Sequence, residues 1–202
     1  MTREPPGRQP GYNERMAEGD YLCNQLLIAM PGMADPNFTQ TVTLICEHNA
    51  GGALGIIINR PLPMTLDEVF AQLALDNRDS GLGERIVLKG GPVQTDRGFV
   101  VHRAGGTWDS TLKVSDDIHV TTSRDVLAAL ASGTGPRDAF VALGYAGWQA
   151  GQLEEEIRAN AWLNVPASDT IVFSLPFEDR WHAAGRLLGI ELNRLGSAAG
   201  HA

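Results

Sequence analysis

Residues 26 to 61 constrain the fold of this 202-residue chain more than any other stretch. Residues 25–30 form a short, continuous apolar run, which is typical of a buried strand. Residues 41–47 alternate between two faces, and the less apolar face carries threonine and isoleucine, which predicts a central strand. A turn with two glycines then leads into the β-branched run 54–59, so the stretch predicts a hairpin. Because proline has no N–H to donate, Pro61 is predicted to end the pairing.

The rest of the chain mixes short helix and strand patterns. The clearest helix is predicted at 65–75, where Thr65 and Glu68 form a T-x-x-E capping box and apolar residues recur at helical spacing. Further helices are predicted from 122 to 130 with Gly133 as the stop, at 151–160, and at 177–188 with Gly189 past the end. Further strands are predicted at 85–89, 97–103, 118–121, 138–145 and 170–175, with a turn at 147–148.

The order of these elements predicts the fold class. Neighbouring strands joined by short turns favour antiparallel pairs, and the strands and helices do not alternate strictly. The chain is therefore expected to be α+β, or a mixed sheet with helices packed on it, rather than a doubly wound parallel fold. We expect one domain over residues 20–193, with flexible tails at 1–19 and 194–202.

The composition limits the classes of function. The 24 acidic and 16 basic residues give a net charge of −8, which opposes non-specific binding to DNA or anionic lipid. No apolar run reaches the roughly 18 residues that span a membrane, and the N-terminus lacks the apolar stretch of a signal sequence. We therefore expect a cytoplasmic protein that does not bind membranes or nucleic acid directly. Its two cysteines, Cys23 and Cys46, are expected to be reduced.

Five segments, taken together and in this order, resemble the YqgE/AlgH family of bacterial proteins. They are AMPGMADPNF, CEHNAGGALGIIINRP, KGGPVQTDRGFVVH, LGYAGWQAGQLEEEIRANAWL and RWHAAGRLLGI. The resemblance extends from about Tyr21 to about Leu192. It implies a single α+β domain whose mixed, mostly antiparallel, bifurcated sheet closes in part into a small barrel and is surrounded by helices. It also implies a cytosolic protein, and the family name carries a link to transcriptional control of alginate synthesis.

The most suggestive local cluster is Cys46-Glu47-His48. A thiolate is the reactive form of cysteine, and a nearby imidazolium lowers the pKa of a thiol. On a strand, however, Cys46 and Glu47 point to opposite faces, and Cys46 shares a face with His48 only if the strand continues that far. The cluster allows two interpretations, a reactive thiol and a buried core cysteine, and the second is favoured.

Asn59, Arg60, Gly90, Gly91 and Arg97 are candidate residues for binding a ligand or a partner. An arginine at a strand end, such as Arg60, can present a forked donor to a carboxylate or phosphate, although an arginine that ties a loop to backbone carbonyls is the favoured alternative. Gly90 and Gly91 with Arg97 could bring the backbone close to an anion. The segment is not a Walker loop, and a turn between two strands explains it equally well.

A polar and aromatic set surrounds the helix predicted at 151–160. Its candidate members are Trp148, Gln152, Glu154 and Asn160. An indole N–H beside amide and acidic side chains can line a ligand or partner site. The alternative is a helix whose apolar side packs Trp162 while its acids face water.

These patterns favour a regulatory or binding protein over an enzyme. The five histidines have no metal-ligand spacing, and neither G-x-S-x-G nor a basic recognition helix occurs. We expect no metal and no cofactor, and action through a protein partner or a small anionic ligand, with self-association as a third reading. The alternative is a redox sensor or enzyme that uses Cys46 with His48 or Glu47, or Arg60 and Arg97 on an anionic ligand.

Overall fold

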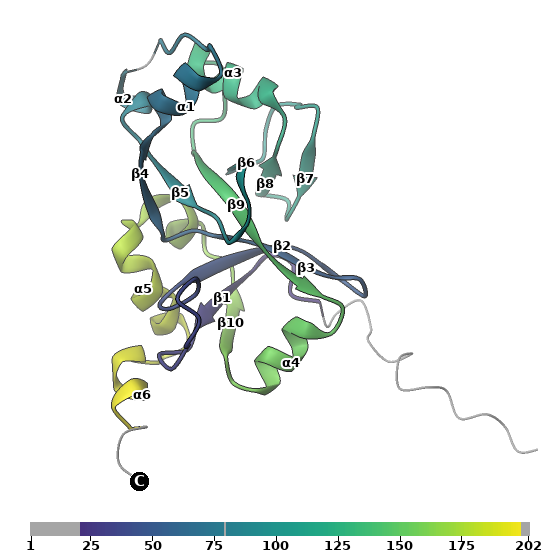
Figure 1. Ribbon diagram of the computed structural model, residues 1–202, viewed down its shortest axis with the longest axis vertical. Helices are drawn as coiled ribbons and strands as arrows, with labels where there is room; N and C mark the ends of the chain where they lie inside the picture. Colours follow the sequence, from purple (N-terminus) through teal and green to yellow (C-terminus); the bar gives the residue numbers. More distant parts are fainter. Residues whose placement is uncertain (1–20, 79, 199–202) are drawn as a thin grey trace, which may run out of the picture.

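Ten strands form one curled sheet in the computed structural model, which describes residues 21–78 and 80–198 (Figure 1). The strands are β1 (Gln25–Ala29), β2 (Val42–Asn49), β3 (Gly52–Ile57), β4 (Pro61–Thr65), β5 (Ile86–Lys89), β6 (Val93–Arg103), β7 (Thr111–Lys113), β8 (Ile118–Thr121), β9 (Ala139–Gln149) and β10 (Trp162–Pro166). The helices are α1 (Leu66–Gln72), α2 (Ser80–Gly83), α3 (Arg124–Ser132), α4 (Gln152–Arg158), α5 (Arg180–Leu187) and α6 (Leu192–Ala198). A π-helical turn (Thr170–Ser174) and a 3-10 turn (Phe177–Asp179) precede α5.

The sheet is mostly antiparallel and branched, which confirms the α+β prediction. Eight strands follow the order β10-β1-β2-β3-β9-β6-β8-β7, and β4 and β5 branch off beside β9. Among the pairings of the described residues, β5 with β9 is parallel and the others are antiparallel. The curl of the sheet is the barrel-like part that the family resemblance implies.

Strand β9 joins the two parts of the sheet. Its C-terminal residues pair with β3, and its N-terminal residues pair with β6. Gly144 lies between these two sections with φ +74°, a left-handed conformation that glycine adopts without strain. The turn predicted at 147–148 is therefore wrong, because Gly147 and Trp148 lie inside β9 and pair with Leu54 and Ala53.

Helices cover the curled sheet in separate groups (Figure 1). Helices α1, α2 and α3 pack on the section around β5, β6 and β9 through an apolar cluster that includes Phe70, Leu130 and Val100. The π-helical turn and α5 pack on β1 and β2, and Trp181 is part of that cluster. Helix α4 packs on the other face of β1 and β9 through Leu153. No helix in the described residues is long and apolar enough to span a membrane.

The predicted ends of three helices are confirmed. The backbone N–H of Thr65 donates to Glu68 Oε2 at 2.7 Å, which forms the capping box at the start of α1. Gly133 follows α3 with φ +79°, and Gly189 follows α5 with φ +70°. These left-handed positions end a helix as the sequence predicts.

Two strand assignments are corrected. Pro61 begins β4 instead of ending the pairing, because β4 pairs only with β5 among the described strands and an edge strand tolerates a missing donor. Residues 170–174 form a π-helical turn rather than the last strand, since a short apolar run fits a buried helix as well as a strand. The last strand is β10.

The structure describes little of the two tails predicted at 1–19 and 194–202. Residues 1–19 and 199–202 are outside the described residues. Helix α6 extends to Ala198, into the segment predicted as a C-terminal tail, and Leu192 at its start is buried against the α5 cluster.

Candidate functional site

The loop between β1 and β2, residues 30–41, is fixed by two consecutive side chains that follow β3, those of Asn59 and Arg60. Asn59 accepts the backbone N–H of Val42 at 2.8 Å and donates to the carbonyl of Gln40 at 2.9 Å. Arg60 donates through Nη2 to the carbonyl of Thr39 at 2.5 Å. These contacts agree with the favoured reading of Arg60, an arginine that ties a loop to backbone carbonyls.

A polar cleft of about 360 Å³ opens where this loop meets α5. We call it the corner cleft; its lining residues are Thr39, Gln40, Asn59, Arg60, Glu178, Trp181 and His182. Gln40 has φ +55°, a left-handed conformation that costs a non-glycine residue about 1 kcal/mol or more. Strained backbone of this kind often marks a binding site, so the cleft is the candidate functional site.

The cleft has free hydrogen-bonding capacity. Within the described part of the chain, the hydrogen bonds of Arg60 leave from Nη2, so Nε and Nη1 have no protein acceptor. His182 contacts Trp181 edge-on, with 5.0 Å between ring centroids, and its nitrogens have no hydrogen-bond partner among these residues. Glu178 adds one exposed carboxylate at the rim. The arrangement offers several donors and one acid to a ligand.

A buried cation, Arg180, precedes the cleft residue Trp181 in the sequence. Arg180 is 3% exposed and donates to the carbonyls of Ile58 at 2.6 Å and Leu175 at 3.0 Å. Its guanidinium lies 4.8 Å from the ring centroid of Phe177 and 5.7 Å from that of Phe140. Burial lowers the pKa of Arg180 to about 10, so the group remains charged at neutral pH.

This charge has no carboxylate partner among the described residues. Arg180 is next in sequence to Trp181, and the carbonyl it binds belongs to the residue before Asn59. Both neighbours line the corner cleft. The guanidinium therefore adds a buried positive charge close in the chain to residues that line this site, in a protein whose net charge is −8.

A second polar cluster lies between α4 and the sheet. Glu156 Oε2 accepts the indole N–H of Trp148 at 2.9 Å and of Trp162 at 2.8 Å. Its other oxygen accepts the Gln152 amide at 2.8 Å. Phe38 packs on both indoles, with centroids 6.2 Å and 5.4 Å away. We call Trp148, Trp162 and Glu156 the indole–carboxylate cluster; its polar atoms bond to one another, which indicates a structural role.

His48 and Glu154 meet at the edge of this cluster. The backbone N–H of Leu22 donates to His48 Nδ1 at 3.0 Å, so the proton of the neutral ring lies on Nε2. Nε2 then donates to Glu154 Oε1 at 3.0 Å. Tyr21 packs edge-on against the ring. The imidazole thus links Leu22, which precedes β1, to Glu154 of α4; among the described residues its side chain bonds to these groups and not to Cys46.

Cys46 is sealed in the core. Its side chain is 1% exposed, and burial raises the pKa of its thiol. Glu47 points outward and accepts the Asn49 amide at 2.8 Å. Cys23 is exposed, although partial burial of its thiol also raises its pKa. These positions favour the core-cysteine reading over the reactive thiol.

Alkylation tests that reading. We expect an excess of iodoacetamide at pH 8 to modify one thiol per folded chain, Cys23, and both thiols in denaturant, because Cys46 reacts only after the core opens. Intact-mass measurement counts the adducts, and peptide mapping assigns them. Rapid modification of Cys46 in the folded protein would contradict the assignment.

The other sequence candidates lie apart from the cleft. A Cβ on Gly91 would lie 2.0 Å from the carbonyl carbon of Tyr145, and one on Gly90 would lie 2.3 Å from another β9 carbonyl oxygen. These glycines therefore allow close approach of two backbones, which favours the turn reading. Arg97 lies over the Phe99 ring, 5.3 Å from its centroid. Asn160 caps the end of α4 with φ +57°.

Of the residues that line the cleft, sequence reasoning singled out Asn59 and Arg60 and missed the others. His182 and Glu178 are four residues apart, a spacing that brings side chains together along a helix, and this was the available signal. Arg180 lies between Asp179 and Trp181 in the sequence, and neither neighbour shows that it is buried. Among the described residues, no group of three or more histidine, cysteine or acidic side chains could hold a metal ion.

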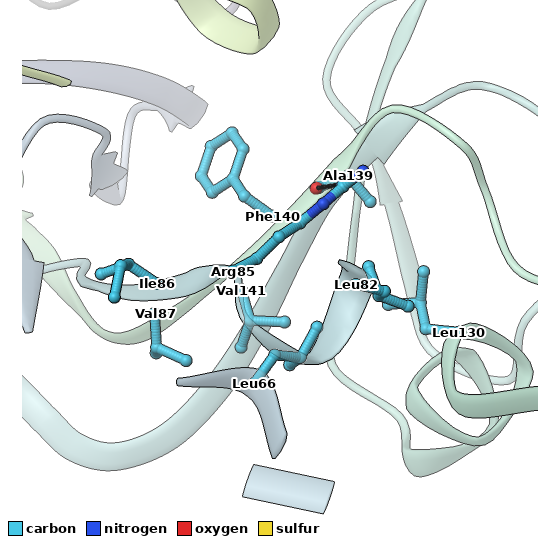
Figure 2. Close-up of a pocket in the computed structure, with 9 residues that line it drawn as sticks. All are labelled: Leu66, Leu82, Arg85, Ile86, Val87, Leu130, Ala139, Phe140 and Val141. Atoms are coloured by element: carbon cyan, nitrogen blue, oxygen red, sulfur yellow. Dashed lines mark hydrogen bonds between the residues drawn. The ribbon is translucent and has the colours of Figure 1, made fainter. Parts of the chain in front are cut away.

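A second cavity, under α2, is too small for a ligand. Its volume is about 10 Å³, roughly the space of one water molecule. Figure 2 shows its walls as mainly apolar side chains, among them Leu66, Leu82 and Val141, with Arg85 extended toward Ala139. Arg85 donates to the carbonyl of Ala139 at 3.3 Å. We regard this cavity as a packing defect of the core.

The fold and the cleft define a small α+β protein with a branched sheet and a polar, cation-bearing cleft at one corner. The chain belongs to the AlgH-like family, which it matches over residues 26–193. It is 51% identical to a UPF0301 protein of Saccharophagus degradans over 188 residues, 92% of each chain. It is also 51% identical to one of Nitrosococcus oceani, over 90% of this chain and 97% of that one.

Two solved structures share the fold. The AlgH protein of Pseudomonas aeruginosa aligns with a TM-score of 0.74 at 50% identity, over 93% of this chain and all of that one. A Corynebacterium diphtheriae protein aligns with a TM-score of 0.68 at 19% identity, over 87% of this chain and 91% of that one, which shows similarity of fold alone. The predicted family is confirmed.

Proposed function

We propose that this chain is a non-enzymatic, cytoplasmic regulatory protein that responds to a small anionic ligand bound in the corner cleft. The observation that carries the proposal is the set of donors at that cleft: Arg60 with unpaired guanidinium donors and the ring of His182, with buried Arg180 next in sequence to Trp181 of the wall. A carboxylate or phosphate group is the chemistry that such donors recognise. The link of the family name to transcriptional control agrees with a regulatory role, and the acidic net charge favours an indirect one.

The thiol enzyme is the weaker alternative. Cys46 is buried and its pKa is raised, which removes the thiolate that such chemistry needs. Arg60 and Arg97 do not line one site.

Binding of simple anions tests the proposal. We expect citrate and inorganic phosphate, titrated at low salt, to shift the backbone amide resonances of the loop at 30–41 and of α5. Arg60→Lys and His182→Ala should each weaken the binding about tenfold, because each loses a charged or hydrogen-bonding contact.

Arg186→Gln is the matched control, since this exposed arginine lies on the same helix but outside the cleft. It should leave the affinity unchanged. Equal weakening in all three variants would show non-specific attraction and contradict the proposal. Native mass spectrometry of protein purified from its own host then identifies the bound molecule.

A further inference from the structure

A separate groove of about 450 Å³ lies on the sheet face between α1 and α3. Its floor is apolar and is formed by Val69 of α1 and Leu73 just after it, Leu127 of α3, and Val141 and Leu143 of β9. A volume of this size with mainly apolar walls is typical of small-molecule sites. The groove shares no lining residue with the corner cleft.

The groove exists because β6 leaves β9. Val93 and Gly98 pair with β9, but the register shifts between them, so residues 94–97 are not paired with it. Gly98 lies on the same face as Val100, which packs in the cluster with α1 and α3. A Cβ built on Gly98 would meet no atom within 4 Å. The missing side chain therefore opens the wall of the groove.

The walls are held in place before any ligand arrives. Arg124 Nη2, at the start of α3, donates to the carbonyl of Leu73 at the end of α1, which links the two helices. The carboxylate of Asp125 accepts the Ser123 hydroxyl and the backbone N–H of Val126. Asp125 therefore occupies the N-terminus of α3. The groove is preformed, which lowers the entropic cost of binding.

Two charged residues line the groove, Arg124 and Asp96, together with Thr122, which lies two positions before Arg124 in the sequence. Arg124 is the lining cation, and one of its terminal nitrogens already bonds to the protein. We propose that this groove binds a small amphipathic anion, with an apolar ring or chain on the floor and its carboxylate or sulfonate group against Arg124. The carboxylate of Asp96 repels the anionic group of the ligand and so limits the affinity.

Anilinonaphthalene sulfonate is a suitable first probe, because it joins an aromatic body to one anionic group. We expect the folded full-length chain to enhance its fluorescence and decanoate to displace it, with decanol at least about tenfold weaker. Gly98→Leu should fill the groove and weaken both ligands about tenfold or more. Gly32→Leu is the matched control, because a Cβ there also meets no atom within 4 Å and the residue lies outside the groove.

Two charge variants separate the anionic group from the apolar body. Arg124→Gln should remove the preference for decanoate over decanol, and Asp96→Asn should tighten decanoate a few-fold. Circular dichroism and the melting temperature confirm that each variant is folded. Equal binding to the original chain and Gly98→Leu, or an unchanged decanoate preference in Arg124→Gln, would overturn the proposal. Because the variants lie outside the corner cleft, either proposal can be contradicted without contradicting the other.

Discussion

Replacing Glu156 by alanine is expected to lower the free energy of unfolding by about 2–4 kcal/mol. One oxygen of this carboxylate accepts two indole N–H groups, those of Trp148 and Trp162. The two tryptophans are 6% and 2% exposed, so water reaches their nitrogens poorly once the acceptor is gone. Each unpaired buried donor costs about 1–3 kcal/mol. The loss should appear in urea unfolding followed by circular dichroism.

Glu155→Ala provides the control for this prediction. Glu155 lies next in sequence, its side chain is exposed, and its change should stay within about 0.5 kcal/mol. Glu156→Gln should cost about 1 kcal/mol, because its carbonyl oxygen still accepts the indoles, while its amide nitrogen cannot accept the hydrogen bond from Gln152. If Glu156→Ala were as stable as Glu155→Ala, water would be pairing the indoles and the cluster would not stabilise α4.

The elements with strong local signals are those that the sequence predicts correctly. The capping box of α1 and the glycine after α3 involve residues close in sequence, so their geometry is local. The π-helical turn at 170–174 was assigned as a strand because its apolar run has no period that separates the two states. The branch at β9 depends on pairings with three distant strands, and only the family resemblance implied it.

In the candidate site, too, features that depend on local sequence were predicted and those that depend on distant contacts were not. Arg60 was identified as a strand-end arginine, and its loop-tethering contacts were the favoured alternative. His48 and Glu154 were both singled out, but their contact spans 106 residues and no local pattern predicts it. Burial of Arg180 is likewise a tertiary property, since its two carbonyl acceptors come from Leu175 and Ile58. The sequence therefore predicts which side chains can bind a ligand or a neighbour, but not which distant side chains come into contact in the fold.

Arg180→Ala is expected to lower the free energy of unfolding by about 3–5 kcal/mol, because it leaves a cavity between Phe140 and Phe177 and frees two buried carbonyls. Arg180→Met restores most of the volume but not the hydrogen bonds, so it should cost about 2 kcal/mol. Arg186→Ala, on the exposed side of the same helix, should stay within about 0.5 kcal/mol. Urea unfolding measures all three.

The methionine variant also separates stability from binding. Removing a buried charge recovers the free energy of its desolvation, which offsets part of the lost bonding. If Arg180→Met is destabilised as expected and also weakens citrate binding in the corner cleft, the guanidinium serves both the core and the cleft. An Arg180→Met chain as stable as the original would contradict the structural role. Weaker citrate binding in that same chain would then show that the buried cation is retained for the anion.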